Sequence, residues 1–224
     1  MKGLHFILFY LKVPPMIKAA GRPRAADLEA RHKNLIEKAG MLFLEMGYGK
    51  VSLDLIAREA HVAVRTIYVK FGGKAGLFKE VLIASRDRFI SPHQMQTDTR
   101  PFKQVIGEFS EHFLAMITAP EALAVQRMVV AEAKNNPELA HSFYDAGPRQ
   151  SREMLSQYFA RPDVRALLRP DLSMEVIPAY LINCVMGDPF SRFLFDPSTQ
   201  PHDEVLALLH KRLELFYQSV LLKA

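Results

Sequence analysis

Two short amphipathic segments in residues 52–71 constrain the fold more than any other feature of this 224-residue sequence. Ser52 is a good N-cap for the first segment, which is expected to end near Ala60. Residues 61–63 leave room only for a tight turn, and a second short helix is expected over residues 64–70. Two short helices at this spacing, preceded by a longer one, are typical of a helix-turn-helix.

The flanking segments are also helical. From Arg31 onward, apolar residues recur along one wide stripe as far as Met46, and Gly47 follows where a left-handed C-terminal cap favours glycine. Lys74 opens a long helix that is expected to reach about Ser91. These segments predict a three-helix unit that continues into a longer connecting helix.

Helical periodicity also dominates the rest of the chain, and no run of alternating β-branched residues is found. After a polar loop at 91–100, helices are expected over 101–117, 121–134, 137–144, 149–159, 173–194 and 202–222. Pro178, Gly187 and Pro189 predict a kink or break in the penultimate helix. The predicted fold is all-α, with an N-terminal helix-turn-helix domain and a helical C-terminal domain.

The predicted domains are 21–78 for the helix-turn-helix and 79–224 for the helical remainder. Residues 1–20 form an extension: an apolar stretch too short to span a bilayer ends at Pro14-Pro15, and Met16 is an alternative start. The basic residues concentrate in the first third. Residues 17–80 hold 12 Lys and Arg against 7 Asp and Glu, whereas residues 81–224 hold 15 against 17. Such an excess fits a phosphate-binding surface, although an ordinary solvated face gives the same count.

The second short helix is expected to lie in the DNA major groove. Ile67 and Phe71 face inward, which leaves an outward set for bases and phosphates: Val64, Arg65, Thr66, Tyr68, Val69 and Lys70. Arg65 is suited to a guanine edge, and Val64 or Val69 to a thymine methyl. Thr66, Tyr68, Lys70 and Lys74 are expected to contact phosphate.

This region resembles the TetR family of transcriptional regulators. The resemblance is carried by the run Ser52–Ala63 and by Thr66-Ile67-Tyr68, Phe71 and Lys74 at their spacings. It implies DNA contacts at Ser52, Arg65, Thr66, Tyr68, Lys70 and Lys74. Three residues depart from the family pattern: His61 replaces a turn glycine, and Ala63 and Gly73 replace serine caps.

The segment Gly21-Arg22-Pro23-Arg24 is similar to the family's flexible leader. Arg22 and Arg24 on such an arm are expected to enter an adjacent minor groove, with a merely solvated tail as the alternative.

Residues 101–222 resemble the AefR-like subgroup of TetR C-terminal domains, through Ala131-Glu132-Ala133, Pro137-Glu138-Leu139-Ala140 and Phe143–Pro148. This resemblance implies that the last two helices form a four-helix dimer interface and that the middle helices enclose a ligand. Apolar residues cover more than one stripe of the last helix, as a dimer requires. The residues assigned to the dimer contact are Leu209, Leu213, Phe216 and Val220.

Aromatic and methionine side chains between residues 102 and 180 are candidates for lining a pocket for a small hydrophobic effector. Ordinary core packing is the alternative for each of them. The candidates are Phe109, Phe113, Met116, Met128, Phe143, Tyr144, Tyr158 and Tyr180.

The sequence gives little indication of a disulfide, a metal site or an enzyme active site. The single cysteine, Cys184, excludes an internal disulfide, and no histidine pair has ligand spacing with a carboxylate, so neither metal nor cofactor is expected. The HExxH, GxSxG and GxGxxG motifs are absent.

The sequence therefore predicts a cytoplasmic homodimer that binds double-stranded palindromic operator DNA as a ligand-released repressor, without catalysis or membrane attachment. The alternatives are a helical small-molecule-binding protein or enzyme without operator binding, and a TetR-like activator.

Overall fold

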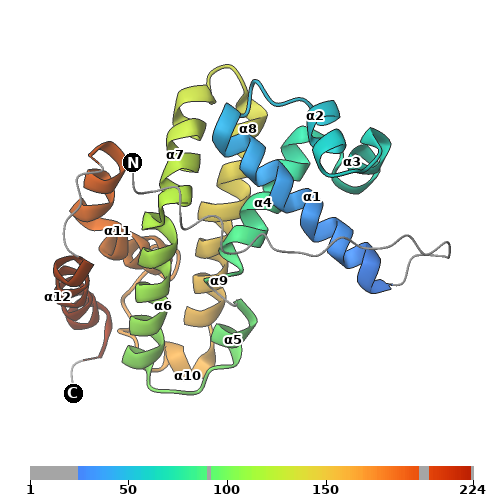
Figure 1. Cartoon of the computed structure of the whole chain (residues 1–224). Helices are drawn as coiled ribbons and strands as arrows, with labels where there is room; N and C mark the ends of the chain where they lie inside the picture. Colours follow the sequence, from blue (N-terminus) through green and yellow to red (C-terminus); the bar gives the residue numbers. More distant parts are fainter. Residues whose placement is uncertain (1–24, 90–91, 197–201, 223–224) are drawn as a thin grey trace.

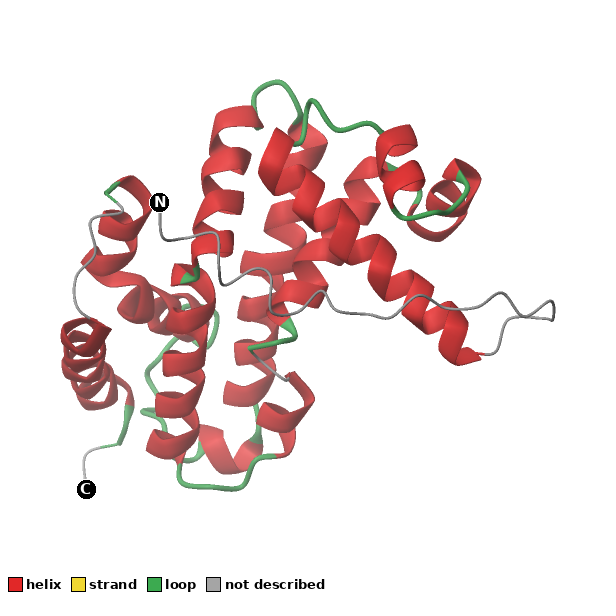
Figure 2. Ribbon diagram, in the orientation of Figure 1, coloured by secondary structure: helices red, strands yellow, loops and turns green. Residues whose placement is uncertain are grey.

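The computed structural model describes residues 25–89, 92–196 and 202–222, and in these ranges the chain forms helices and no strand (Figures 1 and 2). This confirms the predicted all-α fold. The extension at 1–20 and the arginines at 22 and 24 lie outside the described residues.

The first four helices follow the expected pattern. They are α1 (Ala25–Met46), α2 (Leu53–Glu59), α3 (Val64–Phe71) and α4 (Lys74–Arg86). The backbone at Gly47 is left-handed, with φ of 83°, as predicted for the glycine that follows α1. α4 ends at Arg86, earlier than the expected Ser91, and Asp87 caps it.

The C-terminal helices match the predicted segments to within a few residues. They are α6 (Phe102–Thr118), α7 (Pro120–Glu132), α8 (Pro137–Tyr144), α9 (Gln150–Phe159), α11 (Ile177–Phe195) and α12 (His202–Val220). Two short helices were not predicted: α5 (Pro92–Thr97), within the expected loop, and α10 (Pro162–Arg165). A π-helical turn at Asp145–Arg149 joins α8 to α9 around Pro148, which has no N–H to continue an α-helix.

Two hydrophobic cores hold the molecule together. One joins α1, α2, α3 and α4 through residues such as Phe43, Ile56 and Ile67, and it also includes Val129 of α7 and Leu139 of α8. The other fills the C-terminal helices. The predicted domain boundary at residue 78 stays a prediction, since α4 runs across it.

The helix-turn-helix and the last two helices lie on opposite sides of the molecule. α2 and α3 project from one side of the body formed by α6, α7, α8 and α9, and α11 and α12 lie on the other (Figure 1). No single described helix is long and apolar enough to cross a membrane. α6 and α7 meet that length and composition only as a pair, and they are bent by 61° at their junction.

α11 is broken at Gly187, as the sequence predicts. The backbone there has φ of 49° and ψ of −164°, and Pro189 has no N–H to offer the Val185 carbonyl. Arg212 of α12 replaces the missing donors: its Nε donates to the Cys184 carbonyl at 2.6 Å and its Nη2 to the Val185 carbonyl at 3.2 Å. A Cβ at residue 187 would lie 2.9 Å from the guanidinium carbon, so glycine also permits this approach.

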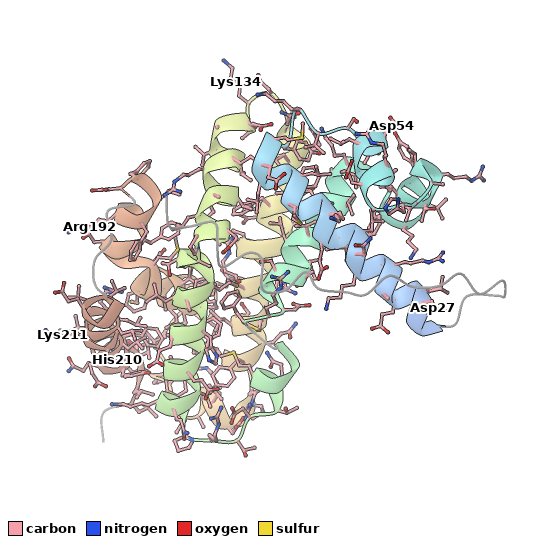
Figure 3. All side chains as sticks on the ribbon, viewed as in Figure 1. Asp27, Asp54, Lys134, Arg192, His210 and Lys211 are labelled. Atoms are coloured by element: carbon pink, nitrogen blue, oxygen red, sulfur yellow. The ribbon has the colours of Figure 1, made fainter. Side chains whose placement is uncertain are left out.

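Replacing Arg212 with methionine is expected to lower the free energy of unfolding by about 2 kcal/mol, because two carbonyls lose a charged donor. Chemical denaturation at fixed protein concentration measures this change. Arg192→Met is the matched control, since Arg192 lies on the outer side of α11 (Figure 3) and forms an exposed ion pair with Asp188. Equal losses in the two variants would contradict the assigned role of Arg212.

Candidate functional site

The turn between α2 and α3 adopts the geometry that the sequence implied. His61 has φ of 54°, in the left-handed region where glycine is usual. The Ser52 hydroxyl caps α2 by accepting the Leu55 N–H at 3.2 Å. Ala63 and Gly73 begin α3 and α4 without a side-chain cap, as expected from the two lost serines.

The outward face of α3 is open to solvent. The Ile67 side chain is fully buried beneath it, whereas Tyr68 is 57% and Val69 is 75% exposed. Arg65 and Lys70 are exposed beside them, and neither side chain has a hydrogen-bond or ion-pair partner among the described residues. Val64 and Thr66 are half-buried at the start of α3. A short helix that presents this mixture of cationic, aromatic and β-branched side chains fits a major groove.

Lys74, which is expected to contact phosphate, forms hydrogen bonds within the protein. Its ammonium donates to the carbonyls of Tyr48 at 2.8 Å and Val51 at 3.0 Å, and it lies 4.2 Å from the centroid of the Tyr48 ring. Burial lowers the pKa of Lys74, and the carboxylates of Glu138 and Glu132 oppose this shift. The ammonium therefore holds the loop between α1 and α2, and the phosphate contact of Lys74 stays a prediction.

Lys70 and Lys74 are expected to respond differently to substitution. Lys74→Met should lower the free energy of unfolding by about 2 kcal/mol, because two hydrogen bonds from a charged donor are lost. Lys70→Ala should leave stability unchanged and reduce the slope of DNA affinity against salt by about one per bound head. Thermal unfolding and salt titrations of duplex binding measure the two effects. A stable Lys74→Met variant with a flattened salt slope would assign Lys74 to phosphate and contradict its structural role.

The predicted pocket residues do not share one space. Phe109, Phe113 and Tyr158 are buried in the C-terminal core, with Met116 packed against it. Each of the three is at most 6% exposed. These side chains therefore serve the core, which was the alternative for each of them.

The other four candidates lie elsewhere. Met128 and Phe143 pack against the core that contains the helix-turn-helix. Tyr144 is 48% exposed and bonds to the guanidinium of Arg152, and Tyr180 is 39% exposed beside α12. The prediction of one common lining is wrong, because the helices that carry these residues contribute to different cores and to the surface.

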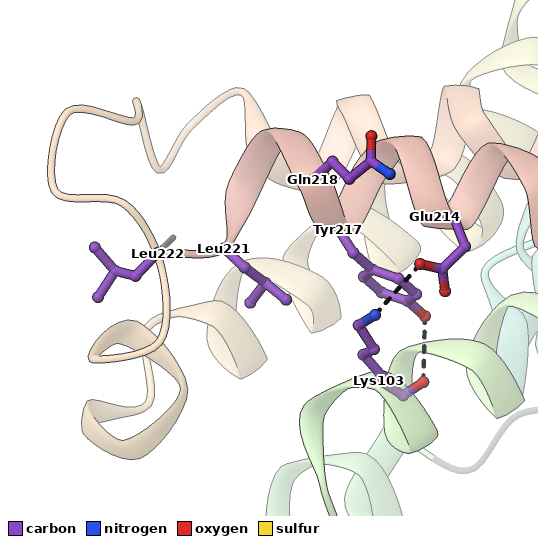
Figure 4. A pocket seen from close by; sticks show the side chains of 6 residues that line it. All are labelled: Lys103, Glu214, Tyr217, Gln218, Leu221 and Leu222. Carbon is purple, nitrogen blue, oxygen red and sulfur yellow. Dashed lines mark hydrogen bonds and ion pairs between the residues drawn. The ribbon is translucent and has the colours of Figure 1, made fainter. Parts of the chain in front are cut away.

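A hollow of about 510 Å³ lies instead between the start of α6 and the end of α12 (Figure 4). Across it, Lys103 Nζ lies 3.3 Å from a Glu214 carboxylate oxygen, and the Tyr217 hydroxyl donates to the Lys103 carbonyl at 3.2 Å. None of the predicted pocket residues is among its lining, which consists of Lys103, Glu214, Tyr217, Gln218, Leu221 and Leu222.

The residues assigned to the dimer contact face the interior of the chain. Leu209, Leu213, Phe216 and Val220 are at most 2% exposed within one chain, because they fill the C-terminal core. They are buried before any partner arrives, so the assignment is corrected.

The exposed side of α12 carries a second stripe with the same spacing. This outer stripe consists of Glu204, Leu208, Lys211, Leu215 and Gln218 on the helix, and of Leu222 just after its end. Its three leucines recur every seven residues and are 41%, 62% and 52% exposed. Tyr180 of α11 adjoins it, with its hydroxyl 3.3 Å from the Ser219 hydroxyl, and Val176, one turn earlier, is 60% exposed. Charged and amide residues between the leucines were the sequence signal that this stripe faces solvent.

Two family models match the chain. The bacterial regulatory proteins of the tetR family match residues 35–81, which include α2, α3 and the exposed face of α3. The AefR-like transcriptional repressor C-terminal domain matches residues 104–214. Together the two matches cover more than half of the chain.

Individual proteins agree with these matches. The transcriptional repressor ComR of Escherichia coli is 25% identical over 175 residues, 75% of this chain and 80% of that protein. A TetR-family regulator from Mesorhizobium loti has a similar structure, with a TM-score of 0.71 and 20% identity over 90% of this chain and all of that one. The flavonoid-responsive regulator FrrA has a TM-score of 0.67 and 22% identity over 88% of this chain and all of that one.

The structural likeness supports the fold, and the two family matches carry the assignment. The chain belongs to the TetR family of DNA-binding transcriptional regulators, with a C-terminal domain of the AefR-like type.

Proposed function

We propose that this regulator is a homodimeric repressor that binds a palindromic operator and is released by a small hydrophobic effector. The observation that carries the proposal is the open face of α3, where Arg65 and Lys70 are exposed beside Tyr68 and Val69. Arg65 reads a base edge, and Tyr68 and Lys70 hold phosphate. Occupancy of the operator blocks transcription, so no catalytic step is needed, and the site of action is the cytoplasm, where the DNA is.

The dimer forms through the outer stripe of α12 together with Tyr180 of α11 and Val176, the residue before that helix. Leucines at seven-residue spacing are typical of a helix that packs against a second helix. Their exposure to water is unfavourable, and a partner helix would bury them. A palindromic operator requires that the twofold axis through this face bring the two α3 helices to the same side of the assembly.

The effector enters the C-terminal core near Phe109, Phe113 and Tyr158. These side chains are closely packed, so the helices that carry them have to separate when the effector binds. Burial raises the pKa of Tyr158 to about 12, which keeps its phenol protonated and able to donate a hydrogen bond. The names of two similar proteins support this proposal: one is called a repressor, and the other is called flavonoid-responsive, which indicates control by an effector in that protein.

A titration of flavonoids and other hydrophobic compounds tests this control, with operator affinity and thermal stability measured on the same samples. Release requires tighter binding to the conformer that does not bind DNA, and a coupling of about 1–3 kcal/mol lowers operator affinity about 5- to 150-fold. Operator DNA should weaken effector binding by the same factor. A compound that stabilises the protein without changing operator affinity would contradict effector release.

An activator is the second candidate within the same family. Its operator binding would be the same, so transcription from a reporter promoter carrying the selected site distinguishes the two. Repression predicts lower transcription in the presence of the protein and recovery on adding the effector.

A further inference from the structure

A carboxylate from the C-terminal domain reaches the loop that precedes the helix-turn-helix. Glu132, the last residue of α7, accepts a hydrogen bond from the Gly49 backbone N–H at 2.6 Å. The Asn136 amide donates to the same oxygen at 3.3 Å, which fixes the direction of the carboxylate. Glu132 belongs to the Ala131–Ala133 motif, to which the sequence assigned no role.

Two glycines make room for this carboxylate. A Cβ at Gly47 would lie 2.8 Å from one Glu132 oxygen, and a Cβ at Gly49 would lie 3.0 Å from the other. Gly47 is also required for its positive φ, whereas no such backbone demand applies to Gly49. The space around Gly49 therefore serves the close approach of Glu132.

The loop that Glu132 holds is tied to α4 as well. Lys74, the first residue of α4, donates to the carbonyls of Tyr48 and Val51 on either side of Gly49. Burial raises the pKa of the Tyr48 phenol, and the nearby carboxylates of Glu138 in α8 and Glu132 raise it further. Hydrogen bonds from α4 and α7 thus meet on the loop of residues 47–52 between α1 and α2.

α7 is also held at its other side. The Arg127 guanidinium donates to the carbonyls of Phe193 and Leu194, each at 2.7 Å, at the end of α11. α7 therefore connects the end of α11, beyond the break at Gly187, with the loop that carries the helix-turn-helix. A rigid helix bonded at both points transmits the position of one to the other.

We infer that Glu132 is a positioning residue for operator binding. By holding Gly49, it fixes the orientation of the head (α1, α2 and α3) on the C-terminal domain, so that the two heads of a dimer stay at the spacing of two half-sites. This inference rests on the proposed dimeric function. The apolar contacts of Val129 and Leu139 keep the head docked without Glu132, so its removal loosens the orientation and does not detach the head.

The test compares two duplexes made from the site that the wild-type protein selects: one with both half-sites and one with a single half-site. Glu132→Ala should lower affinity for the complete site about tenfold and leave single half-site affinity unchanged, because the effective concentration of the second head falls. Glu121→Ala is the matched control, since Glu121 is an exposed acid on the same helix and its loss changes the net charge equally.

Gly49→Ala provides a second route, because its Cβ displaces the carboxylate and leaves Glu132 in the sequence. It should also lower complete-site affinity, and it should cause no further loss when combined with Glu132→Ala. Thermal unfolding establishes that each variant is folded.

Two results would overturn the inference. One is complete-site affinity in Glu132→Ala equal to that of Glu121→Ala. The other is an equal loss on the single half-site, which would make Glu132 a residue that stabilises the head itself. A wild-type protein with no preference for the complete site would instead refute the proposed dimeric function, and the inference with it.

Discussion

Leu215→Glu is expected to convert the protein into a folded monomer that has lost operator binding. Leu215 is 62% exposed at the centre of the outer stripe of α12, so the charge is tolerated in one chain and repelled at a twofold contact. A monomer has one DNA-binding head, so it lacks the higher affinity that two linked heads give. Affinity for the complete site should therefore fall about a hundredfold or more. Sedimentation at micromolar concentration measures the oligomeric state, and circular dichroism measures folding.

A buried leucine of the same helix provides the comparison. Leu209→Glu places the same charge six residues earlier, at a side chain fully buried in the C-terminal core, and it should unfold the chain. Leu44→Glu changes an exposed leucine on α1, far from the stripe, and should remain dimeric. A wild-type protein that sediments as a folded monomer, or a dimeric Leu215→Glu variant, would refute the proposed interface.

Arg65→Ala is expected to weaken operator binding by about 1–3 kcal/mol per half-site and to relax the preference at one base pair in each half-site. The reason is the position of Arg65, exposed in the first turn of α3 and available for a bidentate contact with guanine. Affinity measurements and a repeated selection from random duplexes give the two quantities.

Arg58→Ala separates base reading from charge. Arg58 lies on α2 with its side chain 73% exposed, and its loss removes the same charge from the same head. This variant should bind all duplexes somewhat more weakly and select an unchanged consensus. An unchanged consensus in Arg65→Ala as well would assign Arg65 to phosphate.

The helix-turn-helix was the most predictable part of the molecule, because its signals are local. The cap at Ser52, the short turn around His61 and the glycine at 47 each act within a few residues, and the structure has them as expected. The break at Gly187 was equally local, since proline and glycine chemistry at 187–189 requires it.

The faces of α12 were not predictable by periodicity alone. Leu209 and Leu208 begin two leucine stripes with the same spacing, and each fits the apolar side of a helix. The core takes the uninterrupted stripe, and the stripe broken by Lys211 and Gln218 faces solvent, as Figure 3 shows for Lys211. Composition between the leucines therefore decides the orientation.

The roles of Lys74 and Glu132 depend on contacts between distant segments. Lys74 bonds to carbonyls 23 and 26 residues away, and Glu132 bonds to an N–H 83 residues away. No pattern within one helix predicts such pairs. The places of the pocket candidates could not be predicted for a related reason: the spacing of aromatic residues does not show to which of the two cores a helix contributes.

Selection of bound duplexes from a random library, combined with the stoichiometry of the selected complex, tests the central claim most directly. We expect an inverted repeat of two half-sites bound by two chains, with the strongest base preference lost in Arg65→Ala. A selected pool without a consensus, or a consensus with a single half-site bound by one chain, would contradict it.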